Sequence, residues 1–388
     1  MQTSRAINIL DQTPPYAIFF TLAALDAAFG VGVWLPTLAA APFSPGRELA
    51  AWHGREMLFG YLGASLCGFF FTALPRWTGR PVQPWAVRVV LTLWLVARIA
   101  PPSPHFALAA ALPSVALAAI VTFHILAARN TRNFKMAALL WVYAASAYFT
   151  ADPLAPVTRD FAFRLAIVAL AGLVMTIGGR VLPALTTRFD MVCGEASELA
   201  TKSRIEPSCA AFAALGLMFW LVRPESDASA IALFCAAFGQ ILRMQGWLGK
   251  RTVSSPHLWA FYVAYAMIPA GFALLGAHAL APGNIPQSAG LHVLAVGGFG
   301  GMCLAVKSSM IRKRRNLAFV VSGASVAMAL LWLAALLCRT AAAFAGAPTP
   351  WLLAAALTWA AAFALFLYDF RAPLLREGLL RPLRGRVP

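Results

Sequence analysis

The chain is a succession of long apolar stretches separated by short polar and basic segments. About 20 mainly apolar residues in a helix are enough to cross a bilayer core about 30 Å thick. Helices are expected because backbone groups in lipid must bond within their own segment, and the stretches are too long for barrel strands. The pattern predicts about twelve spans, at residues 16–40, 54–75, 82–100, 105–128, 134–151, 160–182, 207–223, 229–248, 256–280, 288–310, 316–340 and 350–370.

Composition supports this interpretation and excludes a water-soluble protein. Hydrophobic residues make up 61% of the 388 positions and charged residues only 12%, whereas soluble globular chains have about a quarter charged. So few charges cannot cover the surface of a soluble body of this size. We therefore expect an all-α, polytopic integral membrane bundle that forms a single membrane domain over residues 1–388.

Lys and Arg side chains distinguish the two sides of the membrane. Of the 31 Lys and Arg residues, 24 fall in one alternating set of loops and at the two chain ends, and 7 fall in the other set. By the positive-inside rule the basic loops and both termini lie in the cytoplasm, as in a multi-pass protein of the bacterial inner membrane. The basic residues form short groups and no continuous stripe, so nucleic acid is not an expected partner. Membrane lipid is an expected partner, and the basic run 312–315 could contact anionic head groups.

Four of the six histidines fall at the outward face in this topology: His53, His105, His278 and His292. The stretch 52–57 is the richest in possible chemistry, because His53 and Met57 are four residues apart and share a helix face with Glu56 beside them. An imidazole and a thioether can ligate haem iron or copper, and a carboxylate can orient the imidazole or carry protons. Alternatively, Met57 packs against lipid or a neighbour, and Glu56 favours the helix N-terminus while pairing with Arg55.

The stretch 291–302 is the second candidate. Gly297 and Gly301 form a G-x-x-x-G pattern, which lets another helix or a flat cofactor approach the backbone closely. His292 lies one to two turns before these glycines, and Met302 follows them. A cofactor face with His292 as ligand and Met302 as a soft auxiliary is one interpretation, and helix packing alone is the other.

Two further polar positions lie at membrane depth. Asp26 falls near the middle of the first predicted span, where a lone charge is costly, so it is protonated, paired or functional. Arg180 falls near the cytoplasmic end of the sixth predicted span. It either extends its guanidinium to the interface or binds a carboxylate, such as a haem propionate.

Several of these stretches together resemble the NnrS family, bacterial membrane proteins linked to the nitric oxide response and described as containing haem and copper. The residues that carry the resemblance, in chain order, are Trp52-His53-x-x-Glu56-Met57-Leu58-Phe59-Gly60, Gly68-Phe69, Thr72-Ala73-Leu74-Pro75-Arg76-Trp77-Thr78-Gly79-Arg80-Pro81, Trp94-Leu95-x-x-Arg98, Gly178-Gly179-Arg180-Val181-x-Pro183-x-x-Thr186 and His292-x-Leu294-x-Val296-Gly297-x-x-Gly300-Gly301-Met302. The resemblance spans most of the chain and implies about twelve spans with haem or copper.

The chain departs from the family pattern at three places. Arg55 stands where the family has a second histidine, as W-H-x-H-E-M, and an arginine side chain cannot ligate a metal because it stays protonated. Phe261-Tyr262 takes the place of a leucine–histidine pair, and the basic run 312–315 replaces a G-H-T-G-R segment. The ligand positions that remain are His53, with Glu56 and Met57, and His292, with Met302.

The sequence thus favours an NnrS-like protein that binds haem or copper near its outward face and acts in tolerance to nitric oxide. His53 and His292 are the predicted metal or axial ligands. A cofactor-free transporter, with Asp26 as a proton-coupling carboxylate, is one alternative. A scaffold partner of respiratory or denitrification enzymes is another. No hydrolase triad, Walker loop or dinucleotide-binding glycine pattern is present, so the sequence contains no conventional catalytic motif.

Overall fold

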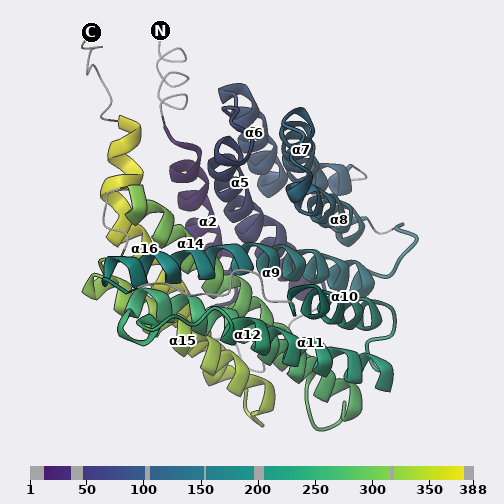
Figure 1. Ribbon diagram of the computed structural model, residues 1–388. Helices are drawn as coiled ribbons and strands as arrows, with labels where there is room; N and C mark the ends of the chain where they lie inside the picture. Colours follow the sequence, from purple (N-terminus) through teal and green to yellow (C-terminus); the bar gives the residue numbers. More distant parts are fainter. Residues whose placement is uncertain are drawn as a thin grey trace, which may run out of the picture. The chain divides into compact units, whose positions relative to one another are not determined.

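A computed structural model describes residues 13–35, 47–100, 105–152, 154–195, 205–314 and 319–379. Within these ranges the chain is helical and contains no strand (Figure 1). The two chain ends that were predicted to be cytoplasmic, and Arg315 of the basic run, lie outside the described residues. The helices group into two compact units.

The first unit contains residues 1–30, 45–166 and 363–388. Its helices are α2 (Pro15–Gly32, to Gly30), α4 (Arg47–Arg55), η1 (Glu56–Tyr61), α5 (Leu62–Thr78), α6 (Pro84–Ile99), α7 (Phe106–Ala127), η2 (Thr131–Asn133) and α8 (Phe134–Ala151), with parts of α9 (Arg159–Val192) and α16 (Thr349–Leu379). Helices α5, α6 and α8 each pack on α7, and α5 also contacts α6. The core is aromatic, with Phe19, Phe20 and Phe70 among its fully buried side chains.

The second unit contains residues 31–44 and 167–362. Besides the remaining parts of α9 and α16, its helices are α10 (Glu206–Val222), α11 (Asp227–Gln245), η3 (Thr252–Ser254), α12 (Pro256–Leu280), α13 (Gln287–His292), η4 (Val293–Gly300), α14 (Gly301–Arg314) and α15 (Gly323–Phe344). Helices α10, α11 and α12 pack in chain order, and α12 also contacts α13, η4 and α14.

Each predicted span overlaps a helix or a continuous run of helical segments, although residues 36–40 of the first span and 316–318 of the eleventh lie outside the described residues. Among the described residues, nine such helices are long and apolar enough to cross a membrane, and α10 is a shorter apolar helix. The predicted spans that correspond to α6 and α8 fall outside that set. The all-helical, multi-pass prediction is therefore confirmed, whereas the count of twelve and the orientation stay predictions.

Large apolar side chains face outward on many of these helices. Phe123 is 65% exposed, and Phe29 and Leu337 are exposed to a similar extent. A water-soluble monomer rarely exposes so many large apolar side chains. Lipid is the solvent that these helix faces fit.

The helix ends carry the sequence signals expected of them. The Ser226 hydroxyl accepts a hydrogen bond from the Ser229 amide at the start of α11, and Ser322 caps α15 in the same way through Ser325. Gly79 ends α5 with a φ of 68°, and its amide donates to the Pro75 carbonyl. A residue with a side chain would be strained there, so this glycine sets where α5 stops.

Two of the helices change to π-helical geometry in mid-course, at η1 and at η4. The change from i→i+4 to i→i+5 bonding interrupts the regular ladder, so buried carbonyls there need other donors. In η1 the Tyr143 hydroxyl donates to the Leu58 carbonyl at 2.6 Å, and the Trp94 indole donates to the Gly60 carbonyl at 3.1 Å. In η4 the Trp332 indole donates to the Val296 carbonyl at 2.8 Å. Aromatic donors thus support both π-helical segments.

Replacing the donor at one such carbonyl should weaken the fold. We expect Tyr143→Phe to lower the free energy of unfolding by about 1–2 kcal/mol, because the Leu58 carbonyl loses a buried hydrogen bond. The measurement is denaturant unfolding of the detergent-solubilised protein followed by circular dichroism. Tyr368→Phe, at an exposed tyrosine, is the control and should change stability by less than about 0.5 kcal/mol. Equal stability of the two variants would contradict the proposed role of the hydroxyl.

Candidate functional sites in the two units

His53 and Met57 meet the same point of α2. The His53 Nδ1 atom lies 3.2 Å from the Gly30 carbonyl oxygen, and a Cβ atom at Gly30 would collide with Met57 Cε. Since a carbonyl oxygen only accepts, His53 donates from Nδ1. The shared face predicted from their spacing is therefore present, and the thioether occupies the space that the glycine leaves.

His292 of the second unit also bonds to a backbone carbonyl, in this case one of its own helix, α13. Its Nδ1 atom donates to the Ser288 carbonyl at 2.7 Å, and it immediately precedes the π-helical segment η4. Met302 follows ten residues later, which is about 15 Å along a regular helix, and it packs near Gly178 and Tyr265. The structure thus brings Met57, but not Met302, to the face of its nearest candidate histidine.

Side chains of neighbouring helices fill the space beside the glycines of the second stretch. A Cβ atom at Gly297 would lie 2.7 Å from Met267 Cγ, and one at Gly301 would collide with the Trp332 ring. These contacts come from α12 and α15. Helix packing, the alternative interpretation of the G-x-x-x-G pattern, is what the structure shows at these positions.

The histidines fit the role of single ligands to haem iron or copper. A metal-binding histidine commonly donates one ring N–H to a backbone carbonyl while its other nitrogen coordinates, and both His53 and His292 satisfy the first half of that pattern. Among the described residues no group of three or more His, Cys, Asp or Glu side chains gathers as a metal site. The two histidines belong to different compact units.

Glu56 lies in a buried charged cluster. Its Oε2 atom accepts from Arg98 Nη1 at 2.7 Å. Asp26 of α2 adjoins the pair, because a Cβ atom at Gly60 would collide with both Asp26 Oδ2 and Arg98 Nη1 and would lie 2.9 Å from Glu56 Oε2. The sequence singled out Asp26 and Glu56 separately, and only the fold brings them together.

Arg55, at the position of the missing family histidine, lies beside this cluster on α4. Its guanidinium carbon is 5.8 Å from the centroid of the Phe106 ring, a cation–π distance. It interacts electrostatically with Glu48, Glu56 and Arg98. Arg55 thus supplies a positive charge where the family pattern supplies a ligand.

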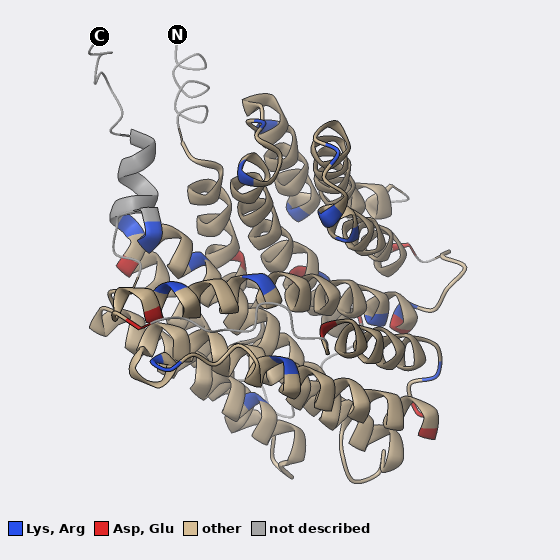
Figure 2. Ribbon diagram, in the orientation of Figure 1, with Lys and Arg blue, Asp and Glu red and all other residues tan. Residues whose placement is uncertain are grey.

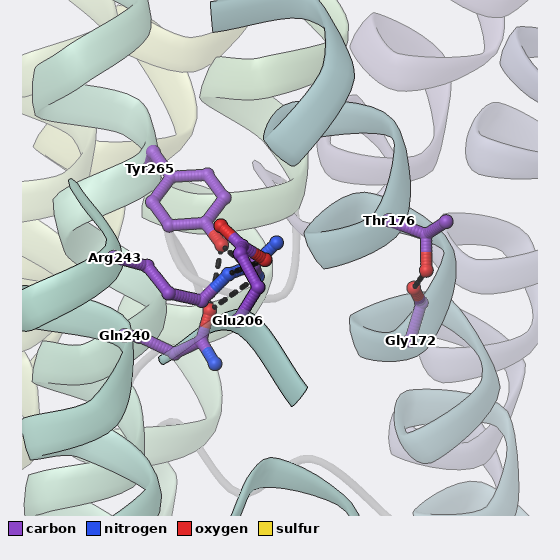
Figure 3. Close-up of polar contacts among 6 residues, drawn as sticks. All are labelled: Gly172, Thr176, Glu206, Gln240, Arg243 and Tyr265. Atoms are coloured by element: carbon purple, nitrogen blue, oxygen red, sulfur yellow. Dashed lines mark hydrogen bonds and ion pairs between the residues drawn. The ribbon is translucent and has the colours of Figure 1, made fainter. Parts of the chain in front are cut away.

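The second unit contains a polar cluster around Arg243 of α11 (Figure 3). Arg243 Nε donates to Glu206 Oε2 at 2.8 Å, and Nη1 donates to Gln240 Oε1 at 3.0 Å and to the Tyr265 hydroxyl at 3.1 Å. The Tyr265 hydroxyl in turn donates to Gln240 Oε1 at 2.6 Å. Sequence analysis counted Arg243 only among the 24 Lys and Arg residues of the predicted cytoplasmic set. The polar residues three apart within an apolar stretch, at positions 240 and 243, were the signal that it missed.

The G-G-R segment of α9 makes room for this cluster. A Cβ atom at Gly179 would collide with Arg243 Nη2, and one at Gly178 would lie 2.7 Å from the Tyr265 ring. Arg180, the next residue, is half-buried. The two glycines therefore allow α11 and α12 to approach α9 closely. Arg243 forms the buried charge network described above.

Tyr262, one of the two residues that replace the family's leucine–histidine pair, is tied to two neighbours. Its hydroxyl donates to the Trp247 carbonyl at 2.5 Å and lies 2.9 Å from the Thr186 hydroxyl. Both it and Phe261 are buried. A hydrogen-bonded tyrosine thus fills the place at which the family pattern has an imidazole.

Charged residues are sparse over the described helices, most of which are coloured as other residues (Figure 2). The apolar helices and the outward-facing large side chains define a multi-pass helical membrane protein. The sequence model of the NnrS protein family matches residues 13–377, and the chain belongs to this family. No curated protein matches the sequence.

The ion pair at Arg243 should contribute measurably to stability. We expect Glu206→Gln to lower the free energy of unfolding by about 1–2 kcal/mol, because a buried guanidinium loses its charged acceptor while Glu206 itself is partly exposed. Thermal unfolding in detergent, followed by circular dichroism, measures it. Glu225→Gln, at an exposed site, is the matched control; a loss of the same size in that variant would contradict a specific role for Glu206.

Proposed function

We propose that this protein binds haem or copper through His53 and His292 near the outward face of the bacterial inner membrane and acts in tolerance to nitric oxide. One observation carries the proposal: both histidines hold Nδ1 on a backbone carbonyl and both stand just before a π-helical segment. Local π-helical turns often occur at functional sites. Membership of the NnrS family supports the same conclusion.

The chain's own contribution is to orient the imidazoles. The Gly30 carbonyl fixes the His53 ring, and the Ser288 carbonyl fixes the His292 ring, so that each has its proton on Nδ1. Bound haem iron or copper would supply the site at which nitric oxide coordinates. Because His53 and His292 belong to different units, each is proposed as a ligand in its own right.

Topology supports the proposed location. The positive-inside rule favours a cytoplasmic position for the basic loops, and this supports a periplasmic position for both histidines. Respiratory or denitrification proteins are the partners that this location makes accessible. A transporter or a scaffold without cofactor is the alternative that the following experiment separates.

The protein purified after expression with haem and copper supplied should show a Soret absorption band or bound copper. His53→Ala and His292→Ala should each weaken binding of the group that the residue holds by about tenfold or more, because an axial ligand is lost. His105→Ala, at an exposed histidine of the same predicted face, is the control and should bind like the wild type. Absence of both a Soret band and copper from the wild-type protein would favour the cofactor-free alternative.

A further inference from the structure

Three charged side chains of the first unit converge on Gly60, and their charges do not balance. Asp26 comes from α2, Glu56 from η1 and Arg98 from α6, and the missing side chain of Gly60 leaves the space in which they meet. Two carboxylates and one guanidinium carry a net negative charge when all are ionised. Such a charge is costly to bury among membrane-spanning helices.

Asp26 is the member of the cluster that lacks a donor. Arg98 Nη1 donates its hydrogen bond to Glu56 Oε2. Asp26 is only 7% exposed, and its buried Oδ2 atom accepts no hydrogen bond from any described residue. A carboxylate oxygen that is buried from water and accepts no hydrogen bond disfavours the ionised form of the group. Neutralisation by a bound positive species removes this cost.

The neighbour of Asp26 shows what that species is. The carboxyl groups of Asp26 and Glu56 meet at the same space, because a Cβ atom at Gly60 would collide with Asp26 Oδ2 and would lie 2.9 Å from Glu56 Oε2. Two ionised carboxylates are both acceptors, so a hydrogen bond between them needs a proton on one of the two. A metal cation is a poor match, since Arg98 Nη1 adjoins the same space and a hard cation prefers six or more oxygen ligands.

We propose that Asp26 is a proton-binding site within the membrane-spanning helices. It holds one proton at neutral pH and shares it with Glu56, which remains the ionised partner of Arg98. The cluster is then neutral, and each carboxyl group has a hydrogen-bond partner. A carboxyl group that takes up and releases one proton at membrane depth is the element that proton relays use.

The charges around the site are consistent with this assignment. The charged groups that act on Asp26 are Glu56 and Arg98. Arg55 of α4 acts on Glu56 and Arg98, and it is itself compensated by Glu48 and opposed by Arg159. Arg55 therefore adds a positive charge that acts on the Glu56–Arg98 pair.

Infrared spectroscopy of the purified protein tests the proposal, because the carbonyl stretching band of a protonated carboxyl group is absent from an ionised one. At neutral pH and without added haem or copper, the wild-type protein should show the band. In Asp26→Asn the band should lose the intensity that one protonated carboxyl group contributes. Glu56→Gln should lose the same intensity, since Asp26 then becomes the ionised partner of Arg98. In Arg98→Gln the intensity that this cluster contributes should rise roughly twofold, because both carboxyl groups then take protons.

Asp160→Asn, at an exposed carboxylate of the same unit, is the matched control and should leave the band unchanged. An identical band in the wild type and Asp26→Asn would overturn the proposal, as would a wild-type protein without the band. If Asp26→Asn does not fold, the opposite changes expected in Glu56→Gln and Arg98→Gln decide the matter. Equal bands in those two variants would overturn the proposal.

Discussion

The constraint on which this structure depends is that every backbone polar group inside lipid needs a partner within the protein. Regular helices meet it by themselves, which is why the described chain is helical wherever it is apolar. The two π-helical segments do not satisfy all their carbonyl groups by themselves, and side chains of other helices supply the missing hydrogen-bond donors. Tyr143 and Trp94 donate to carbonyls of η1, and Trp332 donates to a carbonyl of η4. Those bonds make the irregular segments possible, and with them the positions of His53 and His292.

The same low-polarity surroundings govern the charged residues. Arg243 is buried with an acceptor for most of its donors, and Arg98 is paired with Glu56. Glycines provide the space for both guanidinium groups, at Gly179 and at Gly60. The two clusters differ in their charge balance, because Arg243 has one carboxylate beside it whereas Arg98 has two. That difference is the physical basis for assigning a proton to the first unit.

The helical pattern along the chain was predictable because it follows from local composition. Long apolar stretches have one stable form in lipid, so the positions of the helices agree with those expected from hydropathy alone. The spacing of Gly297 and Gly301 likewise predicted the close approach of another element, although it did not predict which helices approach. The spacing of His53 and Met57 correctly indicated a shared helix face, because four residues make about one turn.

Other features depended on contacts between segments far apart in the chain. Arg243 and Lys307 were counted among the basic residues of the loops, but they are buried in helices. Arg98, counted in the opposite set, is half-buried and pairs with a residue of another helical segment. Asp26 and Glu56 are 30 positions apart in the sequence, and no local pattern links them. The sequence by itself determined the fold class, the membrane as solvent and the candidate histidines, since each rests on local hydropathy or residue type. Tertiary structure alone decided which charges meet and which carboxyl group lacks a donor, because burial and pairing are properties of packed helices.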